Sequence, residues 1–265
     1  MVEYMTTAHS SGAHIHYTDH GGDGPAVLFS HGFMMDRSMF DPQVEALSQD
    51  FRCIAWDERG FGETPADGPF TYWDSANDAI AVLDACGVDQ AVLVGMSQGG
   101  FLSLRAALAH PSRVAGLVLI DSAADADDAE TIGGYEQMLG ALTGDDEDMF
   151  DGVATVVAGL ILGNDELAAE WIPRWKARER SSLHYPGRAL LDRDDVSGRL
   201  GEISAPVLIV HGDADMAIAM DRGRAVCEAV RDCRGVEVIA GGAHASNMTH
   251  PEQVNAALRS FLETL

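Results

Sequence analysis

The chain has 265 residues, a length that suits one large domain or two small ones and a core that needs neither a disulfide nor a structural metal. It carries 42 acidic and 17 basic side chains, which gives a formal net charge of −25. A field of this sign repels nucleic acid and anionic membrane surfaces, so neither is expected as a partner. Two interpretations of the charge stay open: an adaptation to high salt, and a compositional bias that serves solubility.

The sequence shows no pattern for secretion or for membrane insertion. Residues 1–5 lack a basic region followed by an apolar stretch, and no run reaches the length of a membrane span. The cysteines have neither metal-site nor redox spacing, and Cys53 lies in an apolar run typical of a core thiol. Because free thiols suit a reducing compartment, we expect a cytoplasmic protein. The four cysteines are Cys53, Cys86, Cys227 and Cys233.

Short apolar runs rich in branched residues alternate with longer amphipathic segments. Such runs are typical of strands buried on both faces of a parallel sheet. The alternation predicts the α/β class, with a mostly parallel central sheet flanked by helices. The expected strands are 26–29, 53–56, 91–94, 117–120, 207–210 and 236–239, with an edge pair near 2–8 and 13–18. The expected helices lie near 38–49, 72–86, 98–110, 218–232 and 251–264.

One interval breaks this alternation, because the next strand after Asp121 begins only near Pro206. An ordinary crossover connection is far shorter. The interval predicts a helical cap insertion of residues 122–205 over a core made of residues 1–121 and 206–265. Its expected helices lie near 127–142, 148–162, 165–180 and 186–196, with Asn164 as an N-cap.

A nucleophile is predicted where residues 95–99 read Gly-Met-Ser-Gln-Gly between an expected strand and an expected helix. In this setting the serine occupies a sharp turn that lifts its hydroxyl above the sheet edge. The pattern indicates Ser97 as the nucleophile and the backbone N–H of Gln98 as an oxyanion donor. Residues 30–33 read Ser-His-Gly-Phe after the first buried strand, which favours the Phe33 N–H as the second donor.

A general base and its orienting acid are predicted in two later loops. His244 follows the last expected strand, whereas its rival His250 lies at the start of the final helix. Asp215 lies further into its loop than Asp213, which suits a side chain that turns back toward the histidine. Asp121, after an earlier strand, is a third candidate for the acid. The order serine, aspartate, histidine along the chain is the one expected of this architecture.

Together these residues resemble the α/β-hydrolase superfamily, and the likeness covers nearly the whole chain. It rests on His-Gly-Phe at 31–33, Trp-Asp-Glu-Arg-Gly-Phe-Gly at 56–62, the serine turn, His-Gly-Asp-Ala-Asp at 211–215, and His244. The resemblance implies an α/β-hydrolase fold in which the serine, aspartate, histidine and oxyanion residues named above act without a metal or an organic cofactor. The residues of the second motif that we expect to be structural are Asp57, Arg59, Gly60 and Gly62.

Within the superfamily the sequence is similar to capped carboxylesterases and enol-lactonases. This predicts a serine hydrolase that cleaves a small to medium, mainly apolar carboxylic ester or lactone through an acyl-enzyme. The alternatives are a carbon–carbon bond hydrolase or a cofactor-free haloperoxidase or perhydrolase of the same fold, and a non-catalytic ligand-binding receptor. Met34 occupies a position where haloperoxidases often have proline, and Met96 one where carbon–carbon hydrolases usually have asparagine.

We expect apolar side chains to form a pocket over Ser97, which favours a neutral, fairly hydrophobic substrate. Pro173 is expected to kink its helix or to start a new one. The alternative is that these side chains only bury the insertion against the sheet. A carboxylate-bearing substrate would instead indicate Arg174 or Arg178 inside the site. The expected pocket residues are Met34, Met138, Leu142, Phe150, Trp171 and Trp175.

The salt-adaptation interpretation predicts how stability responds to ionic strength. Moderate sodium chloride screens repulsion among like charges, so the melting temperature is expected to rise across a salt series. Differential scanning calorimetry at fixed pH measures this response. A melting temperature that stays flat or falls would leave compositional bias as the better explanation.

Overall fold

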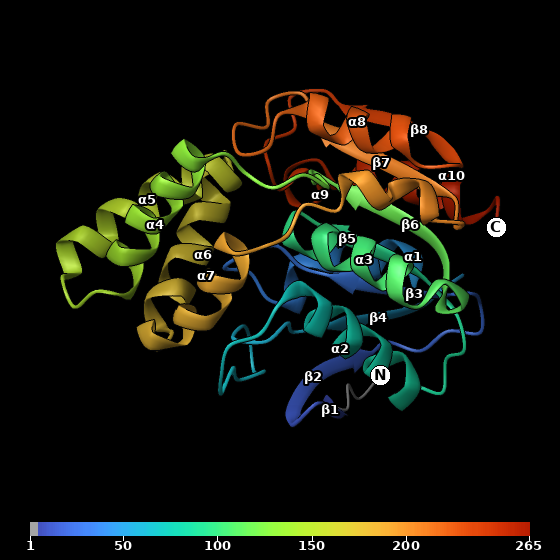
Figure 1. The fold of residues 1–265 in the computed structure, drawn as a ribbon, viewed down its shortest axis with the longest axis horizontal. Helices are drawn as coiled ribbons and strands as arrows, with labels where there is room; N and C mark the ends of the chain where they lie inside the picture. Colours follow the sequence, from blue (N-terminus) through green and yellow to red (C-terminus); the bar gives the residue numbers. More distant parts are fainter. Residues whose placement is uncertain (1–4) are drawn as a thin grey trace.

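The computed structural model describes residues 5–265, so residues 2–4 of the first expected strand lie outside the described part. Its sheet has eight strands in the order β1-β2-β4-β3-β5-β6-β7-β8 (Figure 1). Only the pairings of β2 with β1 and β4 are antiparallel, which confirms the predicted mostly parallel sheet with an edge pair. The strands are β1 (Met5–Ser10), β2 (Ala13–Asp19), β3 (Ala26–Ser30), β4 (Arg52–Trp56), β5 (Ala91–Met96), β6 (Val114–Ile120), β7 (Val207–Gly212) and β8 (Cys233–Ile239).

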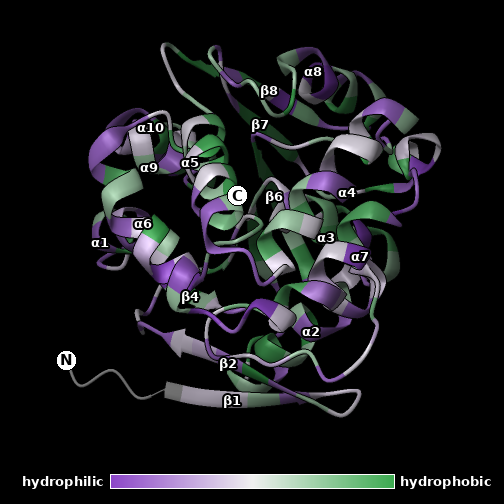
Figure 2. Cartoon of the chain, turned by 90° about the vertical axis from the view of Figure 1, so that its left-hand side faces the viewer, coloured by the Kyte–Doolittle hydropathy of each residue, from purple (hydrophilic) through white to green (hydrophobic). Residues whose placement is uncertain are grey.

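Helices cover both faces of the sheet (Figures 1 and 2). One face carries α2 (Tyr72–Ala85), α3 (Gln98–Ala109) and α8 (Met220–Ala229). The other face carries α1 (Asp41–Leu47), α9 (Ser246–Thr249) and α10 (Pro251–Leu262).

Among residues 5–265, no helix combines the length and the hydrophobicity that a membrane crossing requires.

The core lies along the central strands because both of their faces are covered. Every residue of β5 and of β7 is buried, and β3 is buried except for its first residue. Continuous apolar runs are what strands between two helical layers require. At the edge, β8 consists of half-buried and exposed positions except for its last residue, which is buried.

Four helices of the expected insertion lie together beyond one end of the sheet (Figure 1). Asn164 accepts hydrogen bonds from the N–H groups of Glu166 and Leu167, at 2.9 and 3.0 Å, which confirms the predicted N-cap. No new helix starts at Pro173, which lies inside a helix that continues to Ala177. The four helices are α4 (Ala129–Thr143), α5 (Glu147–Ile161), α6 (Asp165–Ala177) and α7 (His184–Leu191).

The cysteines differ from the expectation of free thiols. Cys227 and Cys233 form a disulfide between α8 and the first residue of β8, with their Cα atoms 5.2 Å apart. Cys53 is a buried free thiol and Cys86 is a half-buried one. The pairing was missed because a spacing of six residues matches no metal or redox motif, and only the turn from α8 into β8 brings the two side chains together.

Candidate active site

Ser97 lies at a sharp turn between β5 and α3. Its φ of +50° is in the left-handed region that residues with a side chain rarely adopt. A Cβ atom at Gly95 would collide with the carbonyl of Gly99, and one at Gly99 would collide with the carbonyl of Ser30. The glycines on either side of the serine therefore permit a turn that no larger residue would fit.

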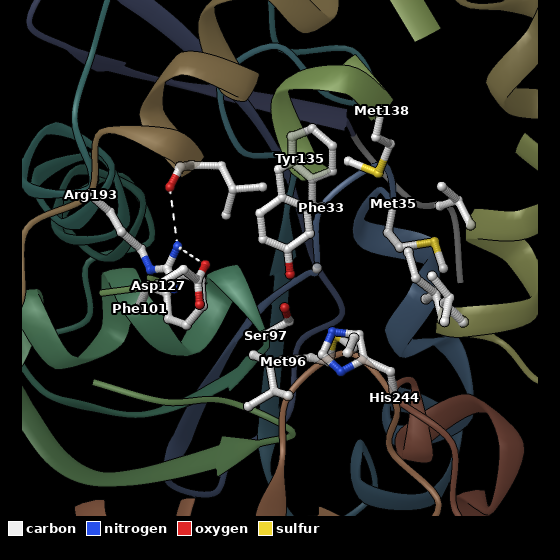
Figure 3. A pocket seen from close by; sticks show the side chains of 17 residues that line it. Phe33, Met35, Met96, Ser97, Phe101, Asp127, Tyr135, Met138, Arg193 and His244 are labelled. Carbon is white, nitrogen blue, oxygen red and sulfur yellow. Dashed lines mark hydrogen bonds and ion pairs between the residues drawn. The ribbon is translucent and has the colours of Figure 1, made fainter. Parts of the chain in front are cut away.

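Neighbouring strand β6 holds this strained turn. The Ser97 N–H donates to the carbonyl of Ile120 at 2.9 Å, and the Ser122 hydroxyl donates to the Ser97 carbonyl at 2.8 Å. Backbone strain persists where the surrounding structure fixes the conformation, and it is concentrated at functional sites. The Ser97 side chain, 8% exposed, faces a pocket that His244 also lines (Figure 3).

His244 contacts Asp215 and neither of the two rival carboxylates. Its Nδ1 atom lies 2.9 Å from Asp215 Oδ2. Asp213 instead accepts from the Gly241 N–H at 2.7 Å and so braces the turn. An Nδ1–H that donates to a carboxylate leaves the lone pair on Nε2, which is the tautomer that a general base requires.

The Asp215 carboxylate accepts several hydrogen bonds. Oδ1 accepts from the N–H groups of Ala217 and Ile218, at 2.8 and 3.0 Å. Oδ2 lies 3.3 Å from Nε2 of His211 as well as close to His244. Burial alone would raise the pKa of this carboxyl, but the hydrogen bonds from the two histidines outweigh burial and hold its pKa well below the usual range. Asp215 is therefore ionised at neutral pH.

Asp121 is fully buried and connects two loops. It accepts from the Gly212 N–H at 2.7 Å and from the Ser246 N–H at 3.1 Å. These bonds tie the end of β7 to the segment that follows His244. Burial raises the pKa of the Asp121 carboxyl to about 6. Its contacts are those of a residue that positions the histidine loop.

Asp121, His211 and Asp215 each offer a ligand atom within 4.8 Å of the others. All four carboxylate oxygens already accept hydrogen bonds from N–H groups of the chain. His211 Nε2 lies 2.9 Å from the Ile218 carbonyl, so that nitrogen carries a proton. The cluster is a hydrogen-bonded network in which every carboxylate oxygen already accepts a bond, while His211 Nδ1 is buried without a partner among the described residues.

Two other histidines that follow strands have structural contacts. His31 is buried, and its Nε2 accepts from the Glu58 N–H at 3.0 Å while Nδ1 donates to the Gly32 carbonyl at 2.8 Å. Burial lowers the pKa of His31, so its ring is neutral. His250 is the N-cap residue of α10, and its Nδ1 lies 2.9 Å from the Thr249 hydroxyl.

The two backbone amides expected to hold an oxyanion are available. Within residues 5–265, neither Phe33 nor Gln98 donates its backbone N–H to another group of the chain. Gln98 opens α3, where the first N–H groups have no partner inside the helix. Its side chain is fixed elsewhere, donating to Glu58 at 2.8 Å and accepting from Tyr72 at 3.2 Å. Burial raises the pKa of Glu58 well above its usual value.

The segment after β4 has structural contacts. Asp57 forms an ion pair with Arg37 and also accepts its backbone N–H at 2.8 Å. Arg59 pairs with the buried carboxylate of Asp78 at 2.5 Å. Gly62 has a φ of +52°, and a side chain there would collide with the Asp57 carboxylate.

The pocket over Ser97 is small, about 80 Å³, and mostly apolar. Of the six expected pocket residues, only Met138 lines it. The other five are buried in packing contacts: Phe150, for example, lies under the guanidinium of Arg180 and Trp171 under that of Arg174. The helical layer therefore hides more apolar surface than expected, and five of the expected residues do not line this pocket: Met34, Leu142, Phe150, Trp171 and Trp175.

Sequence reasoning missed a charged pair in the pocket wall. Arg193 and Asp127 both line the pocket, 2.7 Å apart, and the Arg193 guanidinium lies 4.5 Å from the Phe101 ring centroid (Figure 3). The Tyr135 side chain lines the same pocket. Asp127 belongs to an acidic run that indicated only a helix start, so no local signal pointed to Arg193 as its partner.

We expect Asp215→Asn to lower kcat by about 10⁴-fold, because an amide selects the wrong histidine tautomer. Asp121→Asn is expected to be much milder, since that side chain contacts backbone N–H groups. Initial rates on a chromogenic ester measure both effects, with circular dichroism to verify folding. A larger loss of kcat for the Asp121 variant would show that Asp121, which follows β6, orients the histidine in place of Asp215.

The chain has relatives among known proteins. A family model described as the alpha/beta hydrolase fold matches residues 25–154. A putative carbamate hydrolase RutD of Variovorax paradoxus is 31% identical over 264 residues, which cover 94% of this chain and 96% of that protein. The 3-oxoadipate enol-lactonase 1 of Acinetobacter baylyi is 27% identical, covering 92% and 90%. A thermophilic esterase from Thermogutta terrifontis matches the structure with a TM-score of 0.87 at 25% identity, covering 99% and 98%. The sheet order, the serine turn and these relatives agree, and the chain belongs to the α/β-hydrolase fold family.

Proposed function

We propose that this protein is a serine hydrolase that cleaves a small to medium, mainly apolar carboxylic ester or lactone through an acyl-enzyme. The observation that carries the proposal is the 2.9 Å contact between His244 and Asp215, with His244 and Ser97 lining one apolar pocket. Strain at the serine and a buried, ionised aspartate are features expected of a triad rather than of a binding module.

The first step is acylation. His244 takes the proton from Ser97 as the serine oxygen attacks the carbonyl carbon of the substrate. The backbone N–H groups of Phe33 and Gln98 donate to the oxyanion of the tetrahedral intermediate. His244 then gives its proton to the leaving alcohol, and the C–O bond breaks. Asp215 stabilises the imidazolium and keeps its orientation.

Deacylation repeats these roles with water in place of the serine. His244 takes a proton from the water molecule, whose oxygen attacks the acyl carbon. Collapse of the second intermediate returns the proton to Ser97 and releases the carboxylic acid. Because the same two amides and the same base act in both steps, a single preorganised site supports the whole cycle.

We further propose that residues 122–205 act as a cap that selects the substrate. Side chains of α4 and α5 line the pocket over Ser97, among them Tyr135, Met138 and Val157. Two relatives are named as a putative carbamate hydrolase and a 3-oxoadipate enol-lactonase, so carbamates and enol-lactones belong in a screening panel with simple esters.

Labelling and substitution of Ser97 test the proposed activity. Ser97→Ala is expected to leave the fold intact and to reduce kcat roughly 10⁴–10⁶-fold. A serine-directed phosphonate should add its mass at this residue alone, as read by peptide mass spectrometry. Ser103, buried in α3 with its hydroxyl bonded to the Gly99 carbonyl, is the matched unreactive serine. Labelling elsewhere, or normal turnover by the alanine variant, would refute the assignment.

The charge preference of the substrate is a separate prediction. We expect a higher kcat/KM for an ester with a neutral acyl group than for a matched ester with a carboxylate at its far end. The Arg193 guanidinium is already neutralised by Asp127, and the net charge of −25 repels anions. Rates for the two esters at low and moderate salt provide the measurement. A clear preference for the carboxylate ester would show that an arginine receives it.

A further inference from the structure

A second hollow lies on the cap, between α4 and α5, and we call it the α4–α5 groove. It is lined by residues of both helices, including Gly134 and Ala141 from α4 and Met149, Val153 and Val156 from α5. Its volume is about 500 Å³, against about 80 Å³ for the pocket over Ser97. The space beside the nucleophile is therefore far smaller than the space in the cap.

The α4–α5 groove and the catalytic pocket share a wall. Four side chains line both: Tyr135 and Met138 from α4, and Val157 and Leu160 from α5. Figure 3 shows Tyr135 and Met138 on the cap side of the space in front of Ser97. Met138 has several rotatable bonds and a soft thioether, so it can move aside at low cost. The two hollows are thus adjacent compartments separated by one layer of side chains.

The groove is apolar in an acid-rich protein. Among the residues that the structure describes, no acidic or basic side chain lines it, although the chain has a net charge of −25. The structure describes six exposed large hydrophobic residues, and three of them line this groove: Met149, Val156 and Leu160, at 55, 62 and 41% exposure. Exposed apolar surface gathered in one place indicates a binding site.

We propose that the α4–α5 groove binds the distal part of a long, neutral acyl chain whose carbonyl carbon lies at Ser97. This inference rests on the proposed function, since it needs an ester carbonyl in the catalytic pocket, and it extends the proposed substrate range from small and medium esters to long-chain ones. A short acyl group fits the pocket alone. A longer chain passes between the shared side chains and continues along the groove, where each methylene leaves water for an apolar surface.

Two observations favour an acyl chain over a second copy of this protein. The groove adjoins the catalytic pocket across a wall of four shared residues, which an interface between copies would not require. An acidic cluster at residues 145–148 also lies where α5 begins, next to the groove residue Met149, so two caps that approach each other there repel. The lack of charged side chains in the groove fits a neutral chain.

The test is a chain-length series of chromogenic esters: acetate, butyrate, octanoate and dodecanoate. For the wild-type protein we expect kcat/KM to rise with chain length, by up to about fourfold for each fully buried methylene. Val156→Glu places a charge in the groove, and Val153→Trp fills it. Each is expected to lower the dodecanoate-to-acetate ratio of kcat/KM at least about tenfold.

Thr155→Glu is the matched control. Thr155 is exposed on the same helix and does not line the groove. The substitution therefore adds the same charge as Val156→Glu, one residue away and outside the groove. We expect its dodecanoate-to-acetate ratio to equal that of the wild type. A crystal structure of the adduct with a dodecyl phosphonate on Ser97 supplies a second measurement, in which the alkyl chain should lie between α4 and α5.

The possible outcomes separate the two proposals. If the wild type hydrolyses none of the esters and takes no phosphonate at Ser97, the proposed function fails. If acetate is hydrolysed but the ratio is the same in the wild type and both groove variants, the function stands and the groove inference is overturned. The groove inference is also overturned if the groove variants change the sedimentation of a dimer while leaving the ratio unchanged.

Discussion

The site depends on one close backbone approach, at the turn from β5 into α3. Ser97 adopts a φ of +50°, and the start of the helix lies against the end of β3 so closely that a Cβ at Gly99 would collide with the Ser30 carbonyl. A Cβ at Gly32 would lie 2.5 Å from the sulfur of the flexible Met96 side chain, which would have to move. The segment after β3 is therefore held against the serine turn, and this approach brings the chain around Phe33 to the nucleophile. Glycine is required because any larger residue would separate the two segments.

The features that could be predicted from sequence are those carried by local pattern. Continuous apolar runs gave the parallel strands, and the spacing at residues 95–99 gave the serine turn with its flanking elements. The preference for Asp215 over Asp213 followed from its place further into the loop, and the structure has only Asp215 in contact with His244. Each of these inferences used residues whose neighbours along the chain determine their role.

The features that were missed depend on tertiary contacts. Arg193 and Asp127 are far apart in sequence, and each alone is typical of a solvated surface residue. Trp171 and Trp175 looked like pocket residues because their helical spacing identifies a buried face but does not say what covers it. Helical periodicity shows which face of a helix is buried. What that face packs against depends on how α5, α6 and the core are arranged in space.

Arginines connect the insertion to the core at the two points where the chain leaves and returns. On the leaving side, Arg222 of α8 pairs with Asp125 at 2.9 Å and with Asp127 at 2.7 Å. On the returning side, the fully buried Arg105 of α3 pairs with Asp194 at 2.7 Å. Pairs that are partly removed from water are screened less by salt than exposed pairs. The insertion is thus fixed at its base, and within residues 5–265 no such ion pair joins the outer ends of α4 and α5 to the core.

Two buried aspartates near the same histidine have opposite titration behaviour because their hydrogen-bond donors differ. Asp215 accepts from His244 and two backbone N–H groups, and lies close to His211, so its pKa is lowered. Its contribution to stability is present above the ordinary pKa of an aspartate and is lost as the pH falls through the lowered value. Asp121 accepts only from two backbone N–H groups, and burial raises its pKa to about 6. Ionising Asp121 in the folded state lowers the stability of the fold, and this destabilisation is absent at low pH and reaches its full size above a pH of about 6.

This difference has a structural consequence for the histidine loop. As the pH falls through about 6 the Asp121 carboxyl gains a proton, and a neutral carboxyl is a weaker acceptor for the N–H groups of Gly212 and Ser246. The ties between β7 and the segment after His244 are therefore weakened in a range where the lowered pKa of Asp215 keeps that carboxylate ionised. The carboxylate that contacts His244 and the carboxylate that ties its loop to β7 thus respond to different pH ranges.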